Sequence, residues 1–330
     1  MMELRQLKAM TAIKDHGSFT AAADALDTVQ SNISAHIARL ERELKSVLID
    51  RSTGQLTPAG EIVVIRARQI FDQLSSLETD ISALDDRVQG IVKIGLIGTT
   101  ARWLVPILFD LVPKKWPQLK PTYTEGTSIS LEQEVTHGNL DLAIVNLPST
   151  SAELVAAPMF EEDLVVIVGQ DHPLANKNEI SLAELSQINL ILPAIGTAFR
   201  SELERAAKRA GITLKIQAEI DSIRLIASLT LGGCGPAILP STAVPFYLQN
   251  EWKSVKITDL PPRLVGIVRS RQATQVPAVT AILNILDDSL TIGSKLPRGI
   301  NVSKPGPSSL QSGYRSKRRS IDYDDDIPAE

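Results

Sequence analysis

Apolar residues in the first 48 positions recur at helical spacing in three short segments. The second segment opens with Ser18 and Thr20, residue types that favour helix N-caps. Asp27 and Thr28 mark a turn before the third segment. The third segment has an apolar stripe with a 4-3-4 spacing, made of Ile33, Ile37, Leu40 and Leu44. The pattern predicts three helices, the last two joined by a tight turn.

The side of the third segment opposite this stripe is small and polar, as in a helix-turn-helix whose second helix enters a major groove. Gln and Asn side chains can offer a donor and an acceptor together to adenine. The following stretch VLIDRSTGQLTPAG is typical of a small hairpin or wing, where an arginine can meet a phosphate. Taken alone, the segment also fits a solvated helix N-terminus. The residues predicted to contact DNA are Gln30, Ser31, Asn32, Ser34, Ala35, Arg39, Arg51 and Thr53.

A long helix is predicted next, because Thr57 and Pro58 suit a helix start and residues 61–89 contain neither proline nor glycine. Its apolar residues alternate at spacings of four and three, the repeat of a two-helix coiled coil. We expect a dimer held partly by this helix, and the alternative is a stripe that packs on its own chain. Two such DNA-reading units imply a two-part, roughly palindromic DNA site. The expected dimerisation residues are Val63, Ile70, Leu74, Leu77, Ile81 and Leu84.

Gly90 ends the helical pattern, and strands then alternate with helices. IVKIGLI, LKPTYTEG and LDLAIVNL are separated by helix-like stretches, which implies a parallel α/β sheet. The alternation recurs through DLVVIVG, a helix over about residues 198–210, TLKIQAEI, SIRLIASLTLGG and PAILP. Two α/β lobes are therefore expected, connected near residues 161–163 and 262–265.

Composition and charge narrow the classes of protein. The chain is 43% hydrophobic and 22% charged, and its apolar runs stop far short of the ~20 residues that a membrane span needs. The charged start MMELRQLKAM does not suit an export signal, so we expect a cytoplasmic protein with no membrane partner. A net charge of −4 provides no bulk attraction to DNA, and binding would depend on where individual arginines lie. After about Pro297 the chain is polar, and its RSKRR run lies beside DYDDD, so we expect a disordered tail.

Enzyme chemistry is not indicated. The single cysteine, Cys234, lies between glycines and an apolar run and is expected to be a buried, inert thiol. The four histidines lack metal-ligand spacing, no serine or cysteine has a matching base, and the GLIG turn lacks a full dinucleotide fingerprint. We therefore expect no catalytic residue, no metal and no cofactor.

Landmarks along the chain resemble the LysR-type transcriptional regulators over roughly residues 2–292. In order, they are MELRQLKAM, GSFTAAADAL, QSNISAHIARLERELKSVL, STGQLTPAGE, VKIGLIG, GNLDLAIV, EEDLVVIVGQDHPLA, INLILP and the GCGPAILP stretch. Ala35 departs from the family, which commonly has arginine or lysine there, and one expected DNA contact is thereby removed.

The resemblance implies an α/β fold class: an N-terminal all-α winged helix-turn-helix with a long linker helix, then a two-lobed effector domain similar to type 2 periplasmic binding proteins. The domains would be residues 1–57, 58–89 and 90–296, with the tail at 297–330. Lobe I would comprise about 90–161 and 265–296, and lobe II about 162–264. The implied partners are promoter DNA and a small, anionic metabolite, which would bind between the two lobes and modulate promoter binding. A second copy is implied in a homodimer that pairs into a homotetramer, with RNA polymerase a further candidate. The alternative is a cytoplasmic solute-binding receptor with an N-terminal interaction domain.

Loops after the predicted strands carry the candidate effector contacts. Hydroxyls and free N–H groups at helix starts suit a carboxylate or another anion, and an arginine can clamp a carboxylate with two hydrogen bonds. The threonines and serine could instead cap helices, and the arginine could be a surface residue or an inter-lobe ion pair. The candidates are Thr99, Thr100, Thr127, Ser128, Asn146, Pro193, Ala194 and Arg200.

Overall fold

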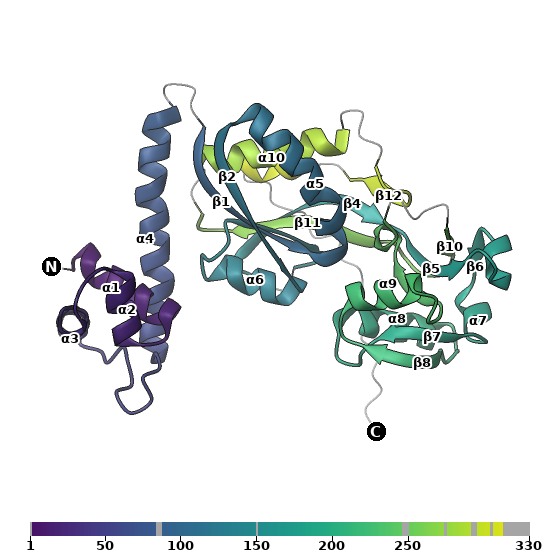
Figure 1. The fold of residues 1–330 in the computed structure, drawn as a ribbon, viewed down its shortest axis with the longest axis horizontal. Coiled ribbons are helices and arrows are strands. Elements are labelled where there is room, and N and C mark those ends of the chain that lie inside the picture. The colour runs from purple at the N-terminus through teal and green to yellow at the C-terminus, as the bar shows by residue number, and fades with distance from the viewer. Residues whose placement is uncertain are drawn as a thin grey trace, which may run out of the picture.

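The computed structural model consists of a helical N-terminal domain, a long helix and two α/β lobes (Figure 1). The residues that it describes are 2–83, 88–149, 151–245, 251–273, 276–291, 296–303 and 306–312. Lobe I lies beside the long helix, and lobe II lies at the far end of the molecule (Figure 1). Among these residues, no helix combines the length and the apolarity that crossing a membrane requires.

The N-terminal domain packs three helices against the start of the long helix. They are α1 (Leu4–His16), α2 (Phe19–Ala25) and α3 (Gln30–Leu44), followed by the long helix α4 (Pro58–Ala83). Ser18 caps α2, because its Oγ accepts a hydrogen bond from the N–H of Ala21 at 3.1 Å. The predicted stripe is buried at Ile33, Ile37 and Leu40, and it packs with apolar residues of α1 and α4. The helix-turn-helix prediction is confirmed.

A short wing joins α3 to α4. Ile49 and Leu56 form an antiparallel bridge, and Gly54 takes a φ of +72° in the turn between them. Thr57 Oγ1 accepts from the N–H of Gly60 at 3.1 Å, which caps α4. The pair of β-prone stretches thus forms a tight hairpin with a single bridge.

The end of α4 corrects the prediction of a helix to Gln89. The helix ends at Ala83 among the described residues, 84–87 lie outside them, and Val88 is not helical. Gln89 already begins a strand and pairs in register with Gln118. Periodicity alone missed this end, because the strand's hydrogen bonds come from a neighbour about 30 residues away.

Lobe I is a six-stranded sheet in the order β12-β4-β11-β3-β1-β2. β1 pairs in parallel with β2 and β3, whereas β11 runs antiparallel to β3 and β4. Helices α5 (Gly98–Lys115), α6 (Ser128–Thr136) and α10 (Pro277–Thr291) accompany it. The strands are β1 (Gln89–Ile97), β2 (Gln118–Gly126), β3 (Leu142–Asn146), β4 (Leu154–Glu162), β11 (Arg263–Ser270) and β12 (Ile300–Val302).

Lobe II has a matching six-stranded sheet in the order β6-β10-β5-β9-β7-β8. β7 pairs in parallel with β8 and β9, and β5 runs antiparallel to β9 and β10. Its α-helices are α7 (Leu182–Leu185), α8 (Ala198–Arg209) and α9 (Ile223–Leu231), and its short 3-10 turns are η1 (Pro173–Asn176) and η2 (Ser241–Ala243). The strands are β5 (Leu164–Gly169), β6 (Glu179–Ile180), β7 (Asn189–Pro193), β8 (Lys215–Ile220), β9 (Ala237–Pro240) and β10 (Trp252–Ile257).

The chain passes between the lobes twice, at Asp163 and over residues 258–262. A buried ion pair marks this hinge. The Glu162 carboxylate, which is fully buried, accepts from Arg263 Nη2 at 2.6 Å and from the N–H of Thr242 in lobe II at 2.8 Å. The hinge is therefore a bonded polar joint between two separately packed cores.

The C-terminal segment corrects the prediction of disorder from residue 297. β12 adds an edge strand to lobe I, with Ile300 opposite Glu162, and the turn η4 (Pro307–Ser312) buries Leu310 against the lobe I core. The polar composition concealed this order, because an edge strand needs only backbone hydrogen bonds and one apolar anchor. Residues 313–330, with the RSKRR and DYDDD runs, lie outside the described residues.

Candidate DNA-binding surface and effector site

The predicted DNA-contacting residues form one polar surface on α3 and the wing. Seven are exposed and Ser34 is half-buried. α3 has no side-chain cap, since Val29 takes the N-cap position, and its first N–H groups suit a phosphate oxygen. The exposed residues are Gln30, Ser31, Asn32, Ala35, Arg39, Arg51 and Thr53.

Asn32 is positioned before any DNA arrives. Its Nδ2 donates to Thr28 Oγ1 at 3.0 Å, one turn before it, which holds the amide on the outer side of α3. Arg39 is only loosely paired, with Nη1 3.9 Å from Glu3 Oε1. A long, exposed ion pair of this kind contributes little energy, so Arg39 can turn to a phosphate.

The wing is fixed at its base and open at its tip. Glu41 Oε1 on α3 accepts from the N–H of Leu48 at 2.8 Å, while the Arg51 side chain is 83% exposed. Asp50 accepts from Ser52, and this hydrogen bond lowers the pKa of the Asp50 carboxyl. Arg51 is thus carried on an ordered turn with its guanidinium in solvent.

Val29 is a surface residue that the sequence analysis missed. It is 60% exposed, directly before Gln30, where a serine, threonine or aspartate cap is usual. An apolar side chain at this place can contact a thymine methyl group. The sequence signal that could have identified Val29 is the absence of a capping residue type directly before the third helix.

The predicted dimerisation stripe divides in two. Val63 packs partly against the N-terminal core of its own chain, together with the buried Val64 and Ala67. Further along, Ile70, Leu74 and Leu77 are 39%, 40% and 57% exposed. The side chain of Ile81 and all of Leu84 lie outside the described residues. Val63 therefore packs in the chain's own core, whereas Ile70, Leu74 and Leu77 lie outside that core and are exposed.

Four predicted effector residues lie at one edge of lobe I. Thr99 and Thr100 begin α5 after β1, and Asn146 ends the neighbouring parallel strand β3, where its N–H donates to Ser128 Oγ at 3.0 Å. Thr99 Oγ1 accepts from Arg263 Nη2 at 2.6 Å, which ties this edge to the hinge. Thr100 Oγ1 and Asn146 Oδ1 are buried without a hydrogen-bond partner among the described residues.

Thr127 is a helix cap. Its Oγ1 accepts from the N–H of Ser130 at 3.2 Å, and Ser130 Oγ accepts from the N–H of Thr127 at 3.0 Å. This reciprocal pair satisfies the free N–H groups at the start of α6. Of the two interpretations that the sequence left open for Thr127, the structure supports the cap.

The contacts of Arg200 correct the prediction of a carboxylate clamp. Its buried guanidinium donates to Glu219 Oε1 on β8 at 2.6 Å, to Glu204 Oε1 at 2.9 Å and to the carbonyl of Pro193 at 2.8 Å. These acceptors are all in lobe II. Ala194 likewise donates its N–H to the carbonyl of Ile220. Arg200 therefore supports lobe II from within, and a sequence alone could not show that Glu219 lies opposite.

A recess of about 300 Å³ lies between α5 of lobe I and α9 of lobe II. Arg102, which lines it, donates from Nη1 to the carbonyl of Ala243 in lobe II at 2.6 Å, and Arg224 pairs with Glu125. Burial raises the pKa of the Tyr123 hydroxyl to about 12, and this oxygen has no partner among the described residues. These side chains were not predicted from the sequence, although Arg102 lies one turn after Thr99.

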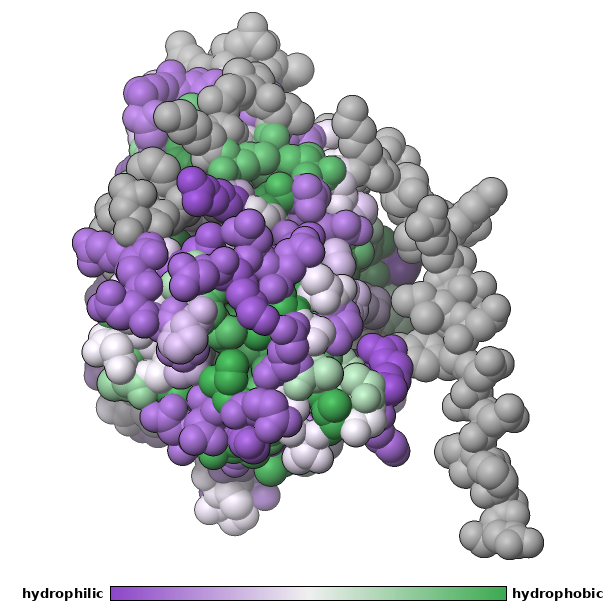
Figure 2. Space-filling model, turned by 90° about the vertical axis from the view of Figure 1, so that its right-hand side faces the viewer, coloured by the Kyte–Doolittle hydropathy of each residue, from purple (hydrophilic) through white to green (hydrophobic). Residues whose placement is uncertain are grey.

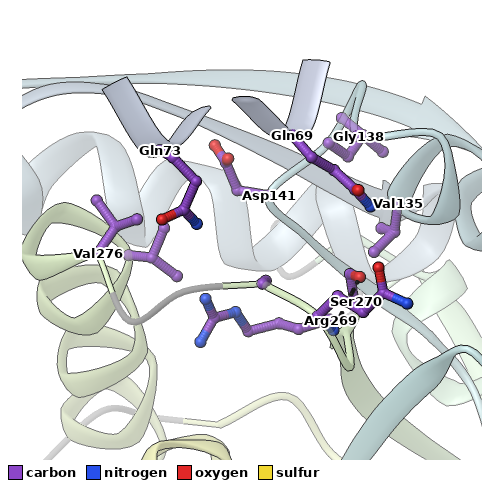
Figure 3. A pocket seen from close by; sticks show the side chains of 12 residues that line it. Gln69, Gln73, Val135, Gly138, Asp141, Arg269, Ser270 and Val276 are labelled. Atoms are coloured by element: carbon purple, nitrogen blue, oxygen red, sulfur yellow. Dashed lines mark hydrogen bonds between the residues drawn. The ribbon is translucent and has the colours of Figure 1, made fainter. Parts of the chain in front are cut away.

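A smaller recess of about 60 Å³ separates α4 from lobe I, and Figure 3 shows Gln69 and Gln73 entering it from α4 and Asp141 and Arg269 lining it from lobe I. Burial raises the pKa of Asp141 and lowers that of Arg269. Since one water needs about 10–15 Å³ by this measure, the space suits a few waters rather than a metabolite. Arg66 Nη1 bridges the same gap to Gln272 Oε1 at 2.6 Å.

Cys234 is exposed, which corrects the prediction of a buried thiol. It lies in the turn after α9, where Gly233 has a φ of +82° and the N–H of Cys234 bonds to the carbonyl of Leu229. The glycines serve this turn, and the apolar run begins only at the next strand. Across the described part of the chain, His, Cys, Asp and Glu form no group of three that could hold a metal.

A helix-turn-helix with a wing, joined through a long helix to two α/β lobes, defines a DNA-binding regulator with a ligand-binding domain. Two family models match: "Bacterial regulatory helix-turn-helix protein, lysR family" over residues 4–61, and "LysR substrate binding domain" over residues 85–291. The chain belongs to the LysR family of transcriptional regulators, binds promoter DNA and is not an enzyme.

Relatives across the family cover most of the chain. It is 31% identical to the nitrogen assimilation regulatory protein nac of Klebsiella aerogenes over 86% of this chain and 94% of that protein. It is also 31% identical to a probable hydrogen peroxide-inducible genes activator of Streptomyces viridosporus, over 73% of this chain and 78% of that protein. Full-length OxyR from Pseudomonas aeruginosa, solved as a cysteine-to-aspartate variant, shares the fold, with a TM-score of 0.73 at 25% identity, over 92% of this chain and 99% of that one.

Proposed function

We propose that this LysR-type regulator binds promoter DNA as a homodimer through α3 and the wing, and that a small anion bound at the lobe I edge modulates that binding. The dimer would pair into a tetramer, act in the cytoplasm and contact RNA polymerase. The observation that carries the effector proposal is the pair of buried, unpartnered atoms at Thr100 and Asn146 among the described residues. A buried polar atom without a partner costs about 1–3 kcal/mol, and a bound ligand would remove that cost.

An anion suits this edge for two reasons. The N-terminus of the 18-residue helix α5 has no side-chain cap, so its positive end faces the same place as Thr100. Arg263 lies next to it, bonded to Thr99 and Glu162. Binding there would therefore act on the hinge through one hydrogen bond, and a shift between lobe arrangements is how a ligand alters a distant site.

Some relatives are named for induction by hydrogen peroxide, and a peroxide signal is the second candidate. A disulfide switch within the chain needs two cysteines, and these 330 residues contain one. Cys234 lies on the exposed turn after α9 in lobe II, whereas Thr100 and Asn146 belong to lobe I. The bound-anion proposal is favoured on that ground.

The dimer proposal rests on the exposed half of the α4 stripe. Ile70, Leu74 and Leu77 recur at spacings of four and three, so they lie along one side of the helix. Replacing Leu74 and Leu77 together by glutamine should convert the dimer to monomer in sedimentation at micromolar concentration. The same change at Val64 would instead unfold the N-terminal domain, because Val64 is fully within the chain's own core.

The effector proposal is tested with a panel of small carboxylates and phosphates in thermal unfolding of the full chain. A compound that raises Tm should lose its effect in Thr100→Val and in Asn146→Leu. Thr197→Ala, at the start of the equivalent helix in lobe II, should retain the shift and is the matched control. A shift that survives both lobe I changes would contradict the proposal.

The DNA surface is tested by footprinting on the protein's own promoter. Asn32→Ala should relax base preference by about 1–3 kcal/mol of discrimination and leave nonspecific binding nearly unchanged. Arg51→Ala should weaken all sequences equally and reduce the salt dependence. Equal loss across sequences for Asn32→Ala would mean that Asn32 supports α3 and does not read bases.

A further inference from the structure

A recess of about 450 Å³ lies at the hinge, on the side of lobe II that β10 lines. Its walls come from the crossing after β4, strand β5 and the segment that follows it, the segment after β9, strand β10 and the C-terminal segment. The volume is within the range of about 300–1,000 Å³ typical of small-molecule sites. The residues that matter here are Asp163, Ser241, Trp252, Lys253, Lys256 and Arg298.

The C-terminal wall is tightly fitted. Gly299 has a φ of +80°, and a Cβ added there would lie 2.8 Å from Ser241 Cβ, so only glycine fits. The Gly299 carbonyl accepts from the N–H of Asp163 at 2.8 Å, which fixes Arg298 at the rim. Because the match to the LysR substrate binding domain ends at residue 291, this wall lies outside the matched region.

The recess carries more positive than negative charge. Lys256 Nζ lies 3.1 Å from Asp163 Oδ1, and Lys253 Nζ donates to the neutral Asn178 Oδ1 at 3.1 Å. Arg298 is exposed and makes no hydrogen bond or ion pair with any residue that the structure describes. The lining thus includes three cations and one carboxylate, a balance that favours an anionic ligand.

One wall is apolar. Trp252 is half-buried, and Val244 beside it is 4% exposed. The surface of this end of the molecule is mainly hydrophilic, with apolar patches between (Figure 2). A local apolar wall under a cationic rim fits a ligand that has a planar or apolar body as well as an anionic group.

We propose that this hinge recess is a second binding site, for a small organic anion such as a phosphate monoester or an aromatic carboxylate. It is separate from the effector site at the lobe I edge. Asp163 and Ser241 are adjacent in sequence to Glu162 and Thr242, whose hydrogen bond joins the lobes. A ligand that contacts both walls binds better to one lobe arrangement than to another, which couples occupancy to the hinge.

The test is calorimetric titration of the full chain with phenyl phosphate and with inorganic phosphate. Phenyl phosphate should bind several-fold more tightly, because only it can use the Trp252 wall. Arg298→Gln and Lys253→Gln should each weaken phenyl phosphate about tenfold, the value of one charge-assisted hydrogen bond. Arg298→Lys should retain most of the affinity, and Lys120→Gln on the exposed face of β2 is the control that should change nothing. An unchanged Tm of each unliganded variant shows that the fold is intact.

Three results would overturn the proposal. One is the absence of saturable phenyl phosphate binding, and another is binding that Arg298→Gln leaves unchanged. Binding lost in Thr100→Val but kept in Arg298→Gln would belong to the lobe I edge, so it would contradict this proposal and not the effector site. The third result would be tighter binding after the acidic run in the tail is neutralised. If replacing Asp322, Asp324, Asp325 and Asp326 by asparagine tightened the binding, the recess would belong to the chain's own tail.

Discussion

The two lobes have the same strand order, yet they treat their polar groups differently. In each, a central strand pairs in parallel with two neighbours, and helices begin after the strands. At the start of α8 in lobe II, Thr197 caps the helix and Arg200 is bonded to Glu219. At the equivalent start of α5 in lobe I there is no side-chain cap, and Thr100 Oγ1 is unpartnered among the described residues.

Buried polar atoms without a described partner follow the same division. Lobe II has one, on Thr230 near the C-terminal end of α9. Lobe I has several, from α5, β2 and the end of β3: Thr100, Trp103, Tyr123 and Asn146. Folded proteins satisfy nearly all such groups, and this concentration of unpaired atoms in lobe I is the basis for proposing the effector site there. The same architecture thus has nearly all of its buried polar groups paired in lobe II and leaves several without a described partner in lobe I.

The largest effect is expected at the joint between the lobes. Glu162→Gln should destabilise the effector domain by about 3–5 kcal/mol, because Arg263 would be left without its charge partner in a buried site. The amide would also turn an N–H towards the donors of Thr242. Chemical unfolding followed by circular dichroism measures this. Glu125→Gln, in the exposed pair with Arg224, should cost no more than about 1 kcal/mol, and equal costs for the two changes would mean that the hinge is no more than a surface contact.

Next in size is the internal support of lobe II. Arg200→Met removes the hydrogen bonds to Glu219 and Glu204 and should cost about 1–3 kcal/mol of stability. It should leave the Tm shift caused by a lobe I ligand unchanged, since none of its contacts is in lobe I. Thermal unfolding with and without that ligand measures both quantities. If the variant lost the ligand-induced Tm shift but kept normal stability, Arg200 would be a ligand clamp after all.

The caps provide a direct comparison of the lobes. Thr127→Ala in lobe I and Thr197→Ala in lobe II should each cost about 1 kcal/mol, because each removes a side-chain cap of the same kind. Differential scanning calorimetry of the two variants measures the pair. If Thr127→Ala were neutral in stability but abolished ligand binding, Thr127 would belong to the effector site.

The smallest effect concerns Tyr123. Its pKa in the folded chain is about 12, above the usual value of 10, so the unfolded state ionises first and folding stability falls as pH rises from 10 to 12. Tyr123→Phe should flatten this decline and change stability below pH 10 by less than about 1 kcal/mol. Unfolding curves at several pH values test this, with spectrophotometric titration of the phenol as a check. An equal decline in the variant would mean that the hydroxyl titrates normally.

The helix-turn-helix could be predicted because its information is local. Ile33, Ile37 and Leu40 recur on one side of a single helix, and Ser18 begins the helix that it caps. The coiled-coil stripe could be predicted only in part. Val63 and Ile70 follow the same heptad spacing, but Val63 packs against its own chain. The sequence could not distinguish the role of Arg200 from that of Thr100. Each follows a strand at a helix start, and only the acceptors opposite them differ.

The amino-acid order by itself determines what periodic patterns can show. These patterns indicate which segments are helices or strands and which sides are apolar, and hence the class of protein. What the tertiary structure decides is which polar groups are satisfied. Glu219 meets Arg200, Glu162 meets Arg263, and Arg298 reaches the rim of the hinge recess only because distant strands pair. Hydrogen bonds and ion pairs act over about 3 Å, and positions brought that close by folding share no pattern along the chain.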